Sequence, residues 1–268
     1  MSYRIAITGK GGVGKTTMAG LVVLRLVQRG CRPVLAVDAD PNTCLDAALG
    51  VKVAKSIGSV REEARTIAGK GMSSGVSKQE LLELKIAESL VESDDFDLIA
   101  MGRPEGPGCY CYANNVLKET LSQISSHYPY VVLDNEAGLE NLSRRIVQKV
   151  DLLVMVSDPS RRSLDTLDRL YKLAQEMGVS YERLAVIINR LHSDVIPEWA
   201  SELEVTAKAD FVFKFLEDPC LAEHVQRDPC LKNLPEKNRV LDAVDALLDK
   251  IGLHKPKTLE NGKRAKID

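Results

Sequence analysis

Short apolar runs rich in β-branched residues alternate along the chain with longer amphipathic segments. The runs are hydrophobic without strict polar alternation, which is typical of strands that helices cover on both faces. Segments 16–29 and 163–177 have helical periodicity and predict two of those helices. The expected strands span residues 5–8, 34–38, 96–101, 130–134, 152–156, 184–189 and 211–215. This alternation predicts an α/β fold with a doubly wound, mostly parallel sheet flanked by helices.

The chain has 268 residues, of which 44% are hydrophobic, and this is enough for one large α/β domain. We expect that single domain to span residues 1–253. Residues 254–268 are polar, basic and without periodicity, and they predict a flexible tail. Residues 50–95 have helical character, with a glycine- and serine-rich interruption at 69–77 that we interpret as a mobile insert on the ligand side.

Charge and hydrophobicity narrow the classes of partner. The 36 lysines and arginines are balanced by 38 aspartates and glutamates, and no long basic block occurs, which disfavours nucleic acid. No apolar stretch approaches the roughly 20 residues of a membrane span, and the first expected strand leaves no room for a signal peptide. We therefore expect a cytoplasmic protein without a membrane partner, whose six cysteines are reduced.

Residues 9–17, GKGGVGKTT, match the phosphate-binding pattern GxxxxGK[ST] between an expected strand and an expected helix. Glycines let the backbone turn and direct N–H groups at phosphate oxygens, Lys15 neutralises the β- and γ-phosphates, and the Thr16 hydroxyl is suited to magnesium. A glycine-rich turn without a ligand is the weaker alternative. The loop thus predicts binding and hydrolysis of ATP. The expected nucleotide-binding residues of the loop are Gly9, Lys10, Gly11, Gly12, Val13, Gly14, Lys15, Thr16 and Thr17.

Carboxylates follow two of the expected strands, at the sheet edge where ligands bind in open α/β folds. Asp134 ends the run 130–134 in a Walker B pattern and is expected to hold magnesium through water. Asp40 is our candidate for positioning the attacking water, and also for contacting magnesium directly or through water. For Asp38 two interpretations stay open, an outer-shell magnesium group or a polar residue at a strand end.

The segment 106–111, GPGCYC, places Cys109 and Cys111 two positions apart in a glycine- and proline-rich loop. In an extended chain, residues two apart point to the same face, so both thiols can approach one ion. Two ligands are too few for a closed tetrahedral site, but a two-fold dimer supplies four. Thiolates suit zinc, copper(I), nickel or an iron–sulfur cluster. The pair predicts a metal shared between subunits; the alternative is two small buried apolar residues. The remaining cysteines are expected to be structural.

Lys10, in KGG, is typical of the deviant-Walker family that includes MinD, ParA and the nitrogenase iron protein, and this chain resembles that family over most of its length. The resemblance implies that Lys10 reaches the phosphates of the nucleotide bound to the partner subunit, although a solvated loop lysine is the alternative. Gly138 resembles the switch glycine that senses the γ-phosphate. Asn189, followed by Arg190, resembles the asparagine that recognises adenine; the alternative is a strand-end turn residue.

The chain also resembles the CooC-type nickel-insertion ATPases, through its phosphate-binding loop, DADPN at 38–42, GPGCYC and VVLDNEAG at 131–138. Residues 101–111 are most similar to the AcsF branch. The resemblance implies a homodimer closed by ATP, nickel or zinc held by paired CxC motifs at the interface, and delivery of nickel to carbon monoxide dehydrogenase or acetyl-CoA synthase. Rival classes are an iron–sulfur reductase or carrier and a ParA/MinD-like positioning ATPase. The reductase pattern requires a second cysteine just after Asp134, where this chain has none.

Overall fold

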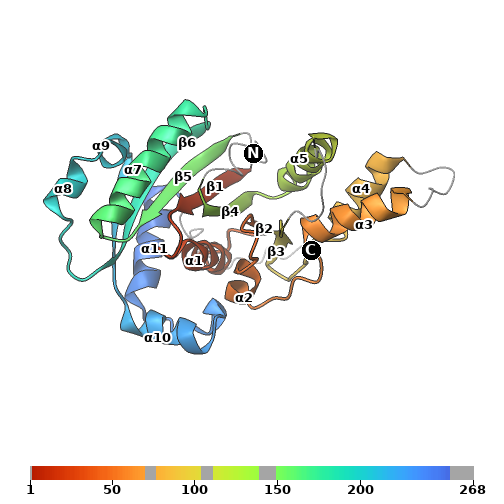
Figure 1. Ribbon diagram of the computed structural model, residues 1–268. Helices are drawn as coiled ribbons and strands as arrows, with labels where there is room; N and C mark the ends of the chain where they lie inside the picture. The colour runs from red at the N-terminus through yellow and green to blue at the C-terminus, as the bar shows by residue number, and fades with distance from the viewer. Residues whose placement is uncertain (1, 70–76, 104–110, 139–148, 254–268) are drawn as a thin grey trace, which may run out of the picture.

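The computed structural model describes residues 2–69, 77–103, 111–138 and 149–253 (Figure 1). Its centre is a seven-stranded sheet in the order β3-β2-β4-β1-β5-β6-β7, and every pair of neighbouring strands is parallel. The predicted strands and their parallel arrangement are therefore confirmed. The strands are β1 (Tyr3–Gly9), β2 (Val34–Asp38), β3 (Phe96–Ala100), β4 (Tyr130–Ala137), β5 (Val150–Ser157), β6 (Tyr181–Leu191) and β7 (Phe211–Leu216).

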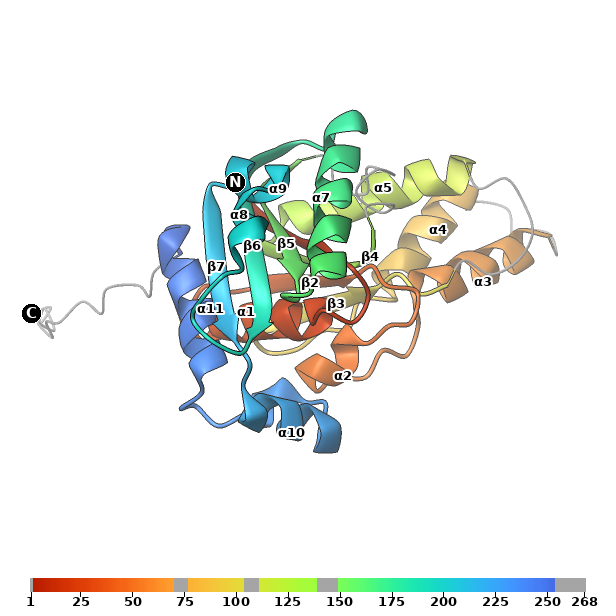
Figure 2. The same cartoon turned by 60° about the vertical axis from the view of Figure 1, so that its left-hand side comes forward.

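Helices cover both faces of this sheet, as the apolar runs predict (Figures 1 and 2). The helices are α1 (Lys15–Gln28), α2 (Leu45–Leu49), α3 (Ile57–Gly69), α4 (Lys78–Ala87), α5 (Cys111–Ser126), α7 (Arg161–Glu176), α8 (Glu198–Ser201), α9 (Glu204–Lys208), α10 (Pro219–Arg227) and α11 (Arg239–Lys250), with a 3₁₀ turn η1 (Leu231–Asn233). The expected helices 16–29 and 163–177 correspond to α1 and α7. Helices α3 and α4 flank the expected interruption, of which residues 70–76 lie outside the described chain.

Alternate strand residues point into two separate cores. Ile5 and Ile7 of β1 pack with α1 and α11, whereas Ala6 between them packs with residues of α3, α4 and α7 on the other face. All three side chains are at most 1% exposed. The period of two along a strand thus places apolar groups on both faces, and this explains why the strands lack polar alternation.

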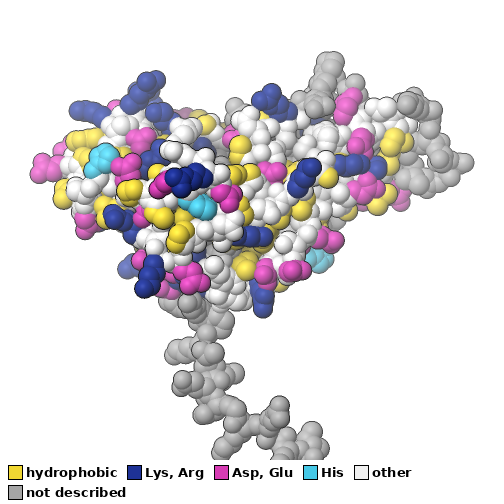
Figure 3. Space-filling model, turned by 90° about the horizontal axis from the view of Figure 1, so that it is seen from below, with side chains coloured by type: hydrophobic (Ala, Val, Ile, Leu, Met, Phe, Trp, Pro, Cys, Tyr) yellow, Lys and Arg dark blue, Asp and Glu magenta, His cyan; other side chains and the backbone are white. Residues whose placement is uncertain are grey.

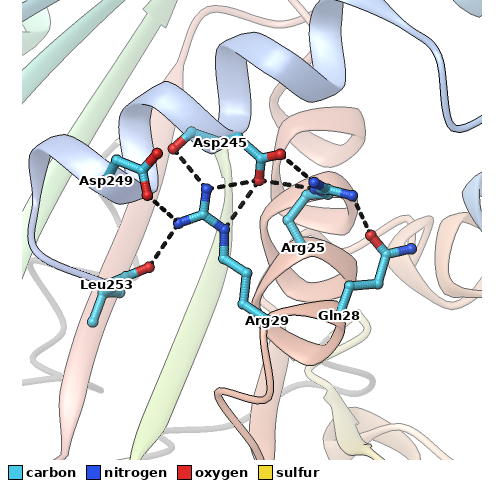
Figure 4. Close-up of polar contacts among 6 residues, drawn as sticks. All are labelled: Arg25, Gln28, Arg29, Asp245, Asp249 and Leu253. Carbon is cyan, nitrogen blue, oxygen red and sulfur yellow. Dashed lines mark hydrogen bonds and ion pairs between the residues drawn. The ribbon is translucent and has the colours of Figure 1, made fainter. Parts of the chain in front are cut away.

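Helix α11 is joined to α1, the helix that follows the phosphate-binding loop, by a network of ion pairs (Figure 4). The Arg29 side chain is only 3% exposed, and its guanidinium donates to the Asp245 carboxylate, the Asp249 carboxylate and the Leu253 carbonyl. Arg25 donates to the other oxygen of Asp245. Since a buried guanidinium must be paired to be tolerated, this network fixes α11 against α1.

The surface seen from below Figure 1 carries lysines and arginines interspersed with aspartates and glutamates (Figure 3). No continuous area of one sign covers this face. Among the helices that the structure describes, none combines the length and the apolar character needed to cross a membrane.

Candidate nucleotide site

The loop between β1 and α1 has a backbone that glycines make possible. At Gly9 a Cβ atom would lie 2.1 Å from the Val156 carbonyl oxygen, too close for any side chain. Gly12 and Gly14 have φ angles of 82° and 98°, in the left-handed region that favours glycine. Gly14 is the N-cap of α1 and provides no side-chain acceptor, so the first amides of α1 remain suited to an anion.

The two loop lysines lie in different environments. Lys15 is 7% exposed and donates from Nζ to the Lys10 carbonyl at 3.1 Å. Burial lowers the pKa of Lys15, against the opposing charges of Asp134, Asp40 and Glu136. Lys10 itself is half-buried. The charge of Lys10 acts on the Asp158 carboxylate. Burial raises the pKa of Asp158, but hydrogen bonds from Ser160 and the charge of Lys10 outweigh burial, so this pKa lies below its ordinary value.

The other loop positions have the exposure expected of a phosphate cradle. Gly11 and Gly12 are exposed at the tip of the loop, and Val13 is fully buried below them. Thr16 and Thr17 lie in the first turn of α1 and are partly exposed.

Asp134 is buried beside this loop with no hydrogen-bond partner among the described residues for either carboxylate oxygen. Burial raises its pKa to about 7; the neighbouring Thr16 hydroxyl and Lys15 ammonium act in the opposite direction but do not compensate. An unpaired buried carboxylate is costly unless a cation neutralises it. Asp134 and Thr16 therefore fit a magnesium ion that keeps several waters and binds substrate phosphates.

Asp38 and Asp40 organise the loop after β2, each in a different way. Asp38 is fully buried, and its two oxygens accept from the backbone amides of Asp40 at 3.0 Å and Leu45 at 2.9 Å. Burial nevertheless raises the pKa of Asp38 to about 6. Of the two interpretations left open by the sequence, the geometry favours a polar group that shapes the loop. Asp40 Oδ1 accepts from the amide and the side chain of Asn42 at 2.8 and 3.0 Å.

Strand β4 continues three residues beyond Asp134, further than the sequence pattern predicts. The β1–β4 register shifts between Ile7 and Gly9, a bulge of the kind often found beside active sites. Two side chains hold this bulge. Asn135 donates to the Ile7 carbonyl at 3.1 Å, and the buried Thr8 hydroxyl donates to the Gly138 carbonyl at 2.6 Å. The position of Gly138 is thus set directly from the strand that leads into the loop.

Asn189, expected to recognise adenine, has a contact with the phosphate-binding loop that the sequence did not predict. Its amide nitrogen donates to the Val13 carbonyl at 2.9 Å, and it packs so closely on Gly14 that a Cβ there would lie 2.8 Å away. Asn189 therefore braces the phosphate-binding loop. Arg190 is exposed in β6, with a positive φ of 57° at a break in the β6–β7 register.

The structure describes only the backbone of one member of the cysteine pair, Cys111. Cys109 lies outside the described residues, and helix α5 begins at Cys111, whose side chain is also outside them. Among the residues that are described, no three histidine, cysteine or acidic side chains gather into a metal site. The described cysteines are free thiols, namely Cys31, Cys44, Cys220 and Cys230.

Comparisons with known proteins agree with this geometry. Residues 3–185 match the AAA domain family. An uncharacterized ATP-binding protein of Methanocaldococcus jannaschii is 39% identical over 251 residues, which are 92% of this chain and 97% of that protein. The carbon monoxide dehydrogenase accessory protein CooC of Rhodospirillum rubrum is 34% identical over 208 residues, 72% of this chain and 76% of CooC. The chain belongs to the AAA domain family.

Solved structures show the same fold as this chain. A ParA family ATPase from Chlorobium tepidum has a TM-score of 0.66 at 20% identity, covering 91% of this chain and 96% of its own. MinD from Pyrococcus horikoshii, complexed with Mg-ADP, has a TM-score of 0.65 at 18% identity, covering 96% and 100%. At these identities the likeness shows the fold alone.

Proposed function

We propose that this chain is an ATP-hydrolysing, nucleotide-gated homodimeric metallochaperone that supports nickel insertion into carbon monoxide dehydrogenase or acetyl-CoA synthase. The observation that carries the nickel assignment is the 34% identity with CooC, an accessory protein of carbon monoxide dehydrogenase, together with the GPGCYC segment. The nucleotide site supports the ATPase half of the proposal.

In this proposal Lys15 and the loop amides bind the phosphates of ATP. Thr16 would hold magnesium directly and Asp134 would hold it through water, and a bound magnesium would supply positive charge against the transferred phosphoryl group. Asp40 orients a water whose oxygen bonds to the γ-phosphorus as the bond to the bridging oxygen breaks, which yields ADP and phosphate. The main support for a magnesium ion here is that neither carboxylate oxygen of Asp134 has a hydrogen-bond partner among the described residues.

The dimer half of the proposal rests on two features that need a second subunit. Lys10 lies at the edge of the loop with its side chain only half-buried, so it can reach a nucleotide on the partner. Cys109 and Cys111 supply two thiolates, and a second copy completes a four-ligand site for nickel or zinc. Both half-sites would meet at one two-fold interface when ATP is bound.

Metal content per dimer tests this proposal. We expect nickel or zinc in the wild type, in an amount that depends on the nucleotide, and a loss of this metal in the variant Cys109→Ser, Cys111→Ser. The variant Cys44→Ser, Cys220→Ser is the matched control, because both of its thiols are free and exposed. Unchanged metal in the first variant would overturn the proposal, and iron with acid-labile sulfide would identify a reductase or carrier instead.

A further inference from the structure

Residues 101–103, which follow β3, are anchored to the end of β2 and to the start of α3. The Met101 amide donates to the Asp38 carbonyl at 2.7 Å, and the Met101 carbonyl accepts from the Gly58 amide at 2.9 Å. Met101 is therefore held on one side by the strand that ends in Asp38 and on the other by the first turn of α3.

Two glycines make this contact unusually close. A Cβ atom at Gly58 would lie 2.0 Å from the Arg103 carbonyl oxygen, and one at Gly102 would lie 2.3 Å from the Ser56 hydroxyl. Gly102 also has a φ of 63°, which favours glycine. Gly58 thus packs on the main chain of Arg103, and Gly102 packs on the side chain of Ser56, so the backbone of Arg103 has a fixed position beside α3.

From this position the Arg103 side chain is connected to Asp40 of the nucleotide site through the side chain of Asn42. Its Nη2 donates to Asn42 Oδ1 at 3.0 Å, and Asn42 Nδ2 donates to Asp40 Oδ1 at 3.0 Å. A guanidinium only donates and a carboxylate only accepts, so the Asn42 amide fits between them in one orientation. The three side chains form a chain of hydrogen bonds that ends on the carboxylate proposed to orient water.

We propose that Arg103 is a positioning residue for Asp40, acting through Asn42. The inference rests on the role of Asp40 in the proposed function. With Oδ1 held by Asn42, the Asp40 carboxylate has a fixed plane and its second oxygen is directed at the attacking water.

A double-mutant cycle on ATP hydrolysis tests whether Arg103 acts on Asp40 through Asn42. We expect Arg103→Gln and Asn42→Ala each to lower kcat roughly three- to tenfold, the contribution of one exposed hydrogen bond, with little change in KM. The double variant should lose no more than the larger single loss, because both changes break the same chain. Arg103→Lys keeps a charged donor and should recover part of the activity.

Arg32→Gln is the matched control. Arg32 is exposed and pairs with Asp95 just before β2 and β3 begin, at the edge of the sheet away from Asp40. We expect it to leave kcat unchanged. Unchanged kcat in Arg103→Gln, multiplying losses in the double variant, or an equal loss in Arg32→Gln would each overturn the inference. The cycle uses no nickel, so the metal content of the cysteine variants judges the proposed function separately.

Discussion

Asp134→Asn is expected to stabilise the nucleotide-free protein while removing its response to magnesium. The wild-type side chain is 1% exposed, and neither oxygen has a hydrogen-bond partner among the described residues. Asparagine has nearly the same shape and no charge. The substitution therefore removes a buried charge that only a bound cation would compensate.

The size of the effect follows from the pKa of Asp134, which burial raises from 3.8 to about 7. At 1.36 kcal/mol for each pKa unit, this difference corresponds to a penalty of about 4 kcal/mol in the free energy of unfolding. Because the folded pKa is raised, the folded state holds the proton more tightly. The penalty is complete above about pH 7, decreases as the pH falls, and is absent below about pH 4.

Urea unfolding of nucleotide-free wild type and Asp134→Asn, measured between about pH 4 and pH 8, checks this expectation. The variant should be more stable by up to about 4 kcal/mol at pH 8 and equal to the wild type near pH 4. Asp94→Asn, at an exposed position, is the control and should show neither effect. Mg-ADP should then stabilise the wild type more than the variant. A variant less stable than the wild type at pH 8, or a difference independent of pH, would refute the reasoning.

Three further changes test other parts of the structure. Arg29→Met should cost about 2–3 kcal/mol in urea unfolding. Burial raises the pKa of Asp245, but the hydrogen bonds from Arg25 and Arg29 outweigh burial and hold this pKa below its ordinary value. The loss of stability in Arg29→Met should therefore shrink in acid as Asp245 is protonated, and a loss that is constant with pH would contradict this. Thr8→Val removes the hydrogen bond to the Gly138 carbonyl and should shift the affinities for ADP and for a non-hydrolysable ATP analogue by unequal factors of roughly two to ten. Thr8→Ser keeps the hydroxyl and should stay near wild type. Equal shifts in calorimetry would count against a switch role for Gly138. Lys10→Ala should keep ATP binding but lose ATP-driven dimerisation and turnover, and full turnover in a phosphate-release assay would contradict its action across a dimer.

The strands and the phosphate-binding loop could be predicted because their determinants are local. A continuous apolar run predicts a strand covered on both faces, and GxxxxGK[ST] requires glycine at positions 9 and 14, both of which have positive φ angles. The same holds for Asp134, whose place at the carboxyl edge follows from the strand before it.

The contacts that hold the site together were not predictable in the same way. Thr8 lies 130 positions from Gly138, and Asn189 lies 176 from Val13, so no local pattern connects them. They meet because β4 and β6 end at the same edge as β1, and the bulge in β4 then decides which atoms are in reach. The extra residues of β4 beyond Asp134 escaped prediction because hydrophobicity ends at the aspartate, whereas pairing with β1 continues.

The ion pairs between α1 and α11 have a consequence for synthesis of the protein. Helix α11 is the last described element to be made, yet its carboxylates neutralise the buried Arg29 of the first helix. Until α11 leaves the ribosome, that guanidinium lacks its carboxylate partners and the apolar face of α1 lacks part of its cover. The nascent chain therefore carries its phosphate-binding loop on a support that only α11 completes.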